Sequence, residues 1–136
     1  MLNRHIEIHD SELANVSIVG GCAELHFSAV CVHQSEGTPG VDAGSSFFQE
    51  ATLRITDVHF RGSFAEFPVD LGNGETRIEG KQFPNEIPLP LAHQGAFELC
   101  LKPMWQEEAV VFIGTGAKLE LFGEPRSVED FPGQKP

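Results

Sequence analysis

Three residues near the start of the chain have side chains of the types that bind metal ions. His5, Glu7 and His9 alternate with Ile6 and Ile8, so on an extended strand they share one face. Two imidazoles and a carboxylate are a donor set for transition metals. On one strand, however, His5 and His9 stand about 13 Å apart, too far to share an ion. The pattern predicts a solvated polar face, with these three residues as metal candidates only if another strand supplies a partner.

The consecutive residues His9, Asp10 and Ser11 contain the three side-chain types of a catalytic triad. A triad is defined by geometry, and on a strand Asp10 points away from its two neighbours. Asp and Ser side chains commonly bind nearby backbone N–H groups and start turns. We therefore expect a structural role here. The sequence assigns no catalytic residue.

Asp57, His59 and Trp105 are the candidate binding residues. Asp57 and His59 share a face if residues 51–61 form an uninterrupted strand, and such a pair can exchange protons. A hydrogen-bonded polar pair at the rim of a sheet is the more typical arrangement. Trp105 is the single Trp in a chain with eleven Phe and no Tyr, so it alone offers a large aromatic face with a strong polar tip.

The cysteines and the N-terminus indicate the compartment. Cys22, Cys31 and Cys100 are odd in number and lack C-x-x-C spacing, so neither a disulfide scaffold nor a zinc knuckle is expected. Cysteines within strands act as small inert hydrophobes. No apolar run reaches about 18 residues, the length of a membrane span, and the N-terminus lacks the apolar core of a secretory signal. We expect a cytoplasmic protein.

The elements that would position these residues follow an apolar period of two, which is typical of strands. Residues 15–28 alternate on both sides of Gly20-Gly21, which predicts a hairpin with a two-residue loop. The register that this loop sets pairs Val19 with Cys22, Ile18 with Ala23, Val16 with Leu25 and Ala14 with Phe27.

Two further hairpins are predicted at glycine-rich turns. A type I′ loop at Asn73-Gly74 would place Val69 opposite Ile78. The same register places two pairs of opposite charges directly across the strands: Asp70 with Arg77, and Glu66 with Lys81. The third turn, Gly114-Thr115-Gly116, joins residues 109–113 to 117–122 through a loop of either two or three residues.

The remaining segments complete an all-β chain. Residues 51–61 are expected as a strand with a bulge near Thr56-Asp57, a helix being the alternative. Further expectations are strands marked by Ile6 and Ile8 and by Phe97, Leu99 and Leu101, a mobile loop over 34–46, an extended or edge segment over 83–90, and a helical turn over 103–108.

Eight or nine short strands built from sequential hairpins predict an antiparallel β-sandwich, with a closed β-barrel as the alternative. Residues 1–123 form the single domain and residues 124–136 a loosely held tail. Pro68 cannot donate to a ladder, so one side of its strand is expected to be an edge. Self-association through an edge strand is then open to the chain.

The 136-residue chain has a formal charge of -11. A protein with this negative charge repels nucleic-acid phosphates and anionic membrane surfaces. We therefore expect no nucleic-acid or membrane partner, and a basic protein is the partner that this charge favours.

The residues His9-Asp10-Ser11-Glu12-Leu13, followed by the hairpin through Phe27, resemble the opening of small uncharacterised bacterial proteins that begin His-Asp-Ser-x-Leu. Some of these proteins resemble immunity proteins of toxin systems. The resemblance covers about a fifth of the chain. It implies an all-β intracellular domain and assigns no catalytic residue.

Two functions follow as hypotheses. The first is a non-enzymatic binding domain, in one form an acidic inhibitor of a basic protein such as a nuclease toxin. The alternative is a barrel that binds a small molecule or a metal, with His and carboxylate groups converging in a Phe-lined cavity. No cofactor is predicted.

Overall fold

The computed structural model describes residues 2–133, and strands in which apolar and polar residues alternate make up most of this range. No helix is present in this range, and the predicted all-β antiparallel class is confirmed. No helix able to cross a membrane occurs among these residues. The nine strands are β1 (Asn3–Val19), β2 (Cys22–Ser35), β3 (Gly44–Thr56), β4 (His59–Arg61), β5 (Val69–Ile78), β6 (Lys81–Pro84), β7 (Glu86–Leu89), β8 (Ala92–Pro103) and β9 (Val110–Phe131).

The strands form one folded-over sheet in the order β6-β5-β8-β9-β3-β2-β1-β7, and β4 pairs with β9. Two residue pairs, Glu12 with Asp70 and Leu13 with Val69, also join β1 to β5. The two halves of the sheet therefore face each other across the core, which is consistent with the predicted sandwich. The buried faces of the strands supply this core, which includes Leu25, Leu53 and Leu99.

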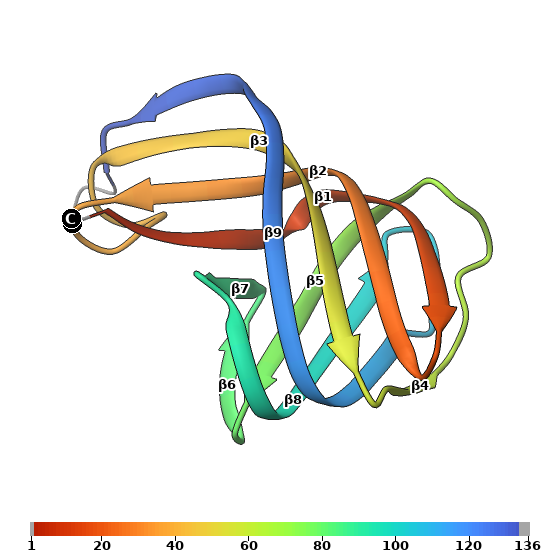
Figure 1. The fold of residues 1–136 in the computed structure, drawn as a ribbon. Helices are drawn as coiled ribbons and strands as arrows, with labels where there is room; N and C mark the ends of the chain where they lie inside the picture. Colours follow the sequence, from red (N-terminus) through yellow and green to blue (C-terminus); the bar gives the residue numbers. More distant parts are fainter. Residues whose placement is uncertain (1, 134–136) are drawn as a thin grey trace.

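Four long strands bend at the same level, where the ladder between them is interrupted. The register shifts beside Asp10 in β1, between Phe27 and Val30 in β2, and between Phe48 and Glu50 in β3. Asp10 and Gly123 of β9 both have positive φ. Beyond this level, residues 3–9, 30–35, 44–49 and 124–131 extend as a curved layer, which we call the arm; the rest of the sheet is the body (Figure 1).

The first predicted hairpin is confirmed close to its turn. Val19 pairs with Cys22, Ile18 with Ala23 and Val16 with Leu25, and Gly20 and Gly21 both have positive φ. The fourth expected pair is wrong, because Phe27 lies opposite Leu13. An extra residue in β1 at this point breaks the register that the turn sets.

The second predicted hairpin is wrong, because β5 runs straight through Asn73-Gly74. The chain instead reverses at Glu79-Gly80, where both residues have positive φ and Ile78 pairs with Lys81. Val69 and Ile78 thus lie in one strand, and Arg77 pairs with Gln82. Gly74 serves close packing: a Cβ there would lie 2.5 Å from the Cys100 carbonyl oxygen and 2.9 Å from Ile8 Cγ2.

The third predicted hairpin is also absent, since β9 continues through Gly114-Thr115-Gly116. A Cβ on Gly114 would lie 2.5 Å from Ile55 Cγ2, and one on Gly116 would lie 2.6 Å from Thr56 Oγ1. These glycines therefore let β9 cross closely over the end of β3. In both corrected segments, tertiary contact rather than a turn explains the glycine.

Several other expectations are settled by the strand bounds. Residues 51–61 are extended, with a break at Asp57, which has positive φ. The expected loop over 34–46 is shorter, because β2 continues to Ser35 and β3 begins at Gly44. The 103–108 segment is a turn without a helix. Residues 83–90 contain the end of β6 and all of β7, and these two strands lie at the opposite ends of the sheet order.

Two expectations about chain ends and edges are corrected. Residues 124–131 are not a loose tail, because they continue β9 and pair with β3 in the arm; residues 134–136 of that expected tail lie outside the described range. Pro68 precedes β5 and does not create an edge there, because β5 has neighbours on both sides.

The Asn73-Gly74 pair offers a direct test of this topology. We expect Gly74→Ala to lower the free energy of unfolding by about 1–3 kcal/mol, because the added methyl group overpacks β5 against β8 and β1. Asn73→Ala is the matched control: its side chain is exposed, and the change should stay within about 0.5 kcal/mol. Urea unfolding monitored by circular dichroism measures both. Equal losses would contradict a continuous β5, because a type I′ turn would need both residues.

Candidate functional site

The pairing of β1 with β2 brings four reactive side chains together on the outer face of the arm. Glu7 lies opposite Cys31, and His5 lies opposite His33. Ile6 between them points into the core, as the alternation of a strand requires. Two strands thus supply an acid, a thiol and two imidazoles to one small area.

Three of these groups converge at His33. Its Nε2 lies 2.7 Å from Glu7 Oε2 and 3.7 Å from Cys31 Sγ. The three candidate ligand atoms all lie within 4.8 Å of one another. Cys31 is buried, and the side chains of His33 and Glu7 are 16% and 31% exposed. The cluster is therefore sheltered but can be reached from one side.

Ser11 explains why Glu7 and Cys31 face each other. It lies in the bulge of β1. Between the pairs Glu7–Cys31 and Glu12–Ala29, β1 advances by five residues and β2 by only two. Its buried hydroxyl donates to the Glu7 carbonyl at 2.8 Å and accepts from the Cys31 N–H at 3.2 Å. The hydroxyl thus replaces the ladder bond that the bulge removes. The expected structural role of the motif holds for Ser11.

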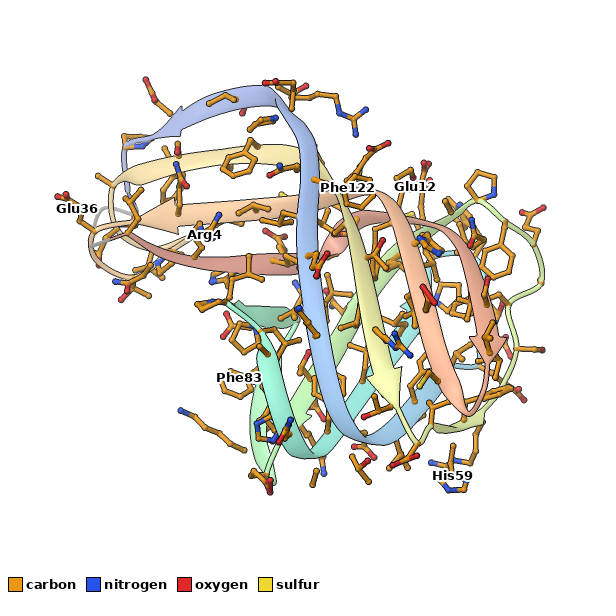
Figure 2. The ribbon with its side chains drawn as sticks, viewed as in Figure 1. Arg4, Glu12, Glu36, His59, Phe83 and Phe122 are labelled. Atoms are coloured by element: carbon orange, nitrogen blue, oxygen red, sulfur yellow. The ribbon has the colours of Figure 1, made fainter. Side chains whose placement is uncertain are left out.

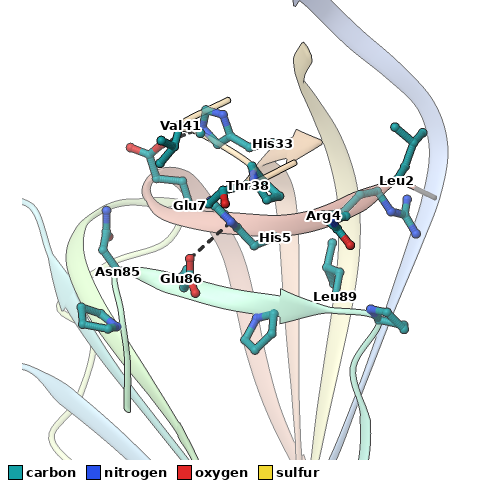
Figure 3. Close-up of a pocket in the computed structure, with 16 residues that line it drawn as sticks. Leu2, Arg4, His5, Glu7, His33, Thr38, Val41, Asn85, Glu86 and Leu89 are labelled. Atoms are coloured by element: carbon teal, nitrogen blue, oxygen red, sulfur yellow. Dashed lines mark hydrogen bonds and ion pairs between the residues drawn. The ribbon is translucent and has the colours of Figure 1, made fainter. Parts of the chain in front are cut away.

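His5 occupies the neighbouring position, beside a pocket (Figure 3). Its Nδ1 lies 3.2 Å from Glu86 Oε2 of β7. Burial lowers the pKa of His5, an effect that Glu86 opposes and His33 reinforces. The pocket, of about 580 Å³, lies between β1, β7 and the loop over residues 36–43, and Gly40 of that loop stands over the two imidazole rings.

Cys31 has a thiol that resists ionisation. Burial raises its pKa to about 12, and the carboxylates of Glu7, Asp10 and Glu129 act in the same direction. The thiol stays protonated near neutral pH unless a cation replaces the proton.

The structure separates the other predicted site residues. His9 is not part of the cluster: its Nδ1 lies 3.6 Å from Asp10 Oδ1, and its N–H donates to Asn85 Oδ1. Asp57 accepts a hydrogen bond from Thr115, and among the described residues it makes none with His59. His59 is exposed at the start of β4, on the outside of the body (Figure 2). Asp57 and His59 therefore do not form an acid–base pair.

A second surface surrounds Trp105, which is 90% exposed. Gln106 links its loop to residues 61–68 of the body: Oε1 accepts from the Ala65 N–H at 3.2 Å, and Nε2 donates to the carbonyls of Ser63 and Glu108 at 2.8 and 2.9 Å. The Met104 N–H also donates to the Asp70 carbonyl at 2.9 Å. These bonds fix the two loops side by side.

We call this area the Trp105 surface. Its exposed apolar members are Phe67, Met104 and Trp105. Phe67 rests on Phe64, with ring centroids 5.3 Å apart. The charged residues on the same two loops and their flanks are the carboxylates Glu66, Asp70, Glu107 and Glu108 and the cations Arg61 and Lys102. Acidic and aromatic groups are thus mixed there.

Comparisons with protein-family models, with curated proteins and with solved structures find no match to this chain.

Cys31 and His33 are the site residues that sequence reasoning missed. The available signal was a Cys-x-His pattern on a strand next to His5 and Glu7. The register set by Gly20-Gly21, continued without bulges, would have placed Gln34 opposite Glu7. The bulge at Asp10–Ser11 moves Cys31 into that place.

Ser11→Ala tests the role of the hydroxyl in the bulge. Two backbone groups lose their partner in a buried place, so we expect a loss of about 1–3 kcal/mol in the free energy of unfolding. Ser17→Ala, an exposed change on the same strand, is the control and should be nearly neutral. Both are measured by chemical denaturation. A neutral Ser11→Ala would show that the bulge does not depend on this side chain.

Thiol reactivity tests the environment of Cys31. In the presence of a chelator at pH 8, iodoacetamide should modify half-buried Cys22 well before Cys31, because only the thiolate reacts and Cys31 holds its proton. Peptide mass spectrometry against time gives the order. Modification of Cys31 first, in folded protein, would contradict the buried environment.

Proposed function

We propose that this chain is a protein-binding domain that docks a basic protein partner on the Trp105 surface. The observation that carries the proposal is the 90% exposure of Trp105 on a loop held in place by Gln106. Trp offers a large apolar area with a polar tip and is enriched among the residues that dominate protein interfaces. A fixed loop also loses little conformational freedom on binding.

The charge of the chain supports a basic partner. The two loops of the Trp105 surface and their flanks carry four carboxylates against the two cations Arg61 and Lys102, and the Lys102 ammonium donates to the Gln106 carbonyl at 2.9 Å. The whole chain carries -11. Such a field speeds the approach of a cationic protein and depends on ionic strength. Aromatic contact would then supply the affinity, and the carboxylates the orientation and the rate.

In its sharper form the proposal is an immunity-like inhibitor of a basic toxin in a bacterial cytoplasm. The His9-Asp10-Ser11-Glu12-Leu13 resemblance, the odd number of cysteines and the acidity support this form. Blocking a cationic active site needs only a rigid acidic surface with an aromatic anchor, and no catalysis by the inhibitor.

The test begins with a partner captured from the source cells on the full-length chain and identified by mass spectrometry. We expect a basic protein. Trp105→Ala should weaken its binding by about 2 kcal/mol or more, roughly thirtyfold, as measured by surface plasmon resonance. The double change Glu107→Lys and Glu108→Lys should mainly slow association, and this slowing should fade at high salt.

Val128→Ala is the matched control, because Val128 is 60% exposed on the arm, away from the Trp105 surface. It should bind like the wild type. An acidic partner, or full binding by Trp105→Ala, would overturn the proposal. Sedimentation velocity of the chain alone distinguishes partner binding from self-association, in which two copies pair through the edge strands β6 or β7.

A further inference from the structure

Among the described residues, one set of three groups has the positions of metal ligands, and it lies in the arm rather than on the Trp105 surface. We propose that Glu7, Cys31 and His33 bind a divalent transition-metal ion of the Zn²⁺ class, with a remaining coordination position open to the neighbouring pocket. This site is independent of the proposed protein-binding function.

The donor set suits such an ion. Zn²⁺ accepts thiolate, imidazole and carboxylate ligands at about 2.0–2.3 Å in a tetrahedral arrangement, which separates neighbouring ligand atoms by about 3.3–3.8 Å. The 3.7 Å between Cys31 Sγ and His33 Nε2 already fits this geometry. The 2.7 Å between Glu7 Oε2 and His33 Nε2 is a hydrogen-bond distance, so the carboxylate must withdraw by about 0.6 Å to admit the ion. Glu7 is a flexible, partly exposed side chain that can make this movement.

The backbone holds the ligands in place before any ion binds. Glu7 and Cys31 are cross-strand partners, and the Ser11 hydroxyl bonds to the main chain of both. His33 follows on the same face of β2. Ligands on paired strands keep their spacing, which removes much of the ordering cost of binding. Ser11 is thus a positioning residue for the site.

The local charge also favours a cation. The charged groups that act on the Cys31 sulfur are the carboxylates of Glu7, Asp10 and Glu129. Together with a thiolate they would form a concentrated negative region, which a divalent ion neutralises. His33 Nδ1 is buried and makes no hydrogen bond among the described residues. The ring lies against that of His5, with centroids 5.5 Å apart, and its Nε2 is directed at the other two ligands.

Three protein ligands leave a fourth position, as in zinc sites that bind water or an exchangeable ligand. The pocket beside Glu7 and His33 has room for such a ligand at about 580 Å³, and His5, aligned by Glu86, also lines it. The ligand class is a water molecule or a small molecule with one donor atom for the metal.

Cobalt(II) is the probe, because it takes zinc geometry and reports on its ligands by absorption. After chelator treatment, the full-length chain should bind one equivalent of Co²⁺ and show a sulfur-to-cobalt charge-transfer band together with the visible bands of a tetrahedral centre. An added equivalent of Zn²⁺ should remove these bands. Absence of the charge-transfer band in folded wild-type protein would overturn the proposal.

Variants assign the ligands. Cys31→Ser should abolish the charge-transfer band, Glu7→Gln and His33→Gln should each weaken Co²⁺ binding at least tenfold, and Ser11→Ala should weaken it while keeping the band. Circular dichroism verifies that each variant is folded. If Cys31→Ser fails to fold, the other three variants and a Zn²⁺-dependent rise in the Tm of the wild type decide the question.

Cys100→Ser is the matched control for the thiol. Cys100 is half-buried and faces the carboxylates of Glu75 and Glu98, as Cys31 faces those of Glu7 and Asp10. No histidine belongs to a three-ligand set with it among the described residues. The Co²⁺ spectrum should be unchanged in this variant, and a band that Cys100→Ser removes and Cys31→Ser keeps would place the metal elsewhere.

Discussion

The bulge at Asp10–Ser11 is the constraint on which the rest of the structure depends. Without a bend, strands as long as β1 and β9 would extend the sheet beyond its core. The break in the ladder at one level lets the arm turn away from the body (Figure 1). Asp10 accepts a positive φ, and Ser11 satisfies the backbone groups that the break exposes. Asn85 completes this corner by accepting from the Ile8 N–H and the His9 N–H.

The same corner creates the chemistry of the arm. Because the bulge adds residues to β1 but not to β2, Glu7 meets Cys31, and the acid, the thiol and His33 collect on one face. The Trp105 surface has a different origin: it forms where two loops of the body are joined through Gln106. The molecule thus separates a sheltered polar cluster from an exposed aromatic surface, so either can be altered without the other.

Local alternation predicted much of the fold. Ile6 and Ile8, and likewise Phe97, Leu99 and Leu101, point inward as a period of two requires. The Gly20-Gly21 turn set three correct pairs. By contrast, Asn73-Gly74 and Gly114-Thr115-Gly116 have the composition of turns but lie inside β5 and β9. The sequence does not distinguish a glycine that forms a turn from one that allows a neighbouring strand to approach closely. Only the position of that neighbouring strand separates the two roles.

What the sequence by itself determined is the all-β class, the inward faces of the strands, the acidity of the chain and the candidacy of His5, Glu7 and Trp105. Only the tertiary structure decided which strands are neighbours, that Cys31 and His33 complete the cluster, and that His9 and His59 stand apart from it. The physical reason is that pleating is local to each strand, whereas every bulge shifts the register for all pairs beyond it.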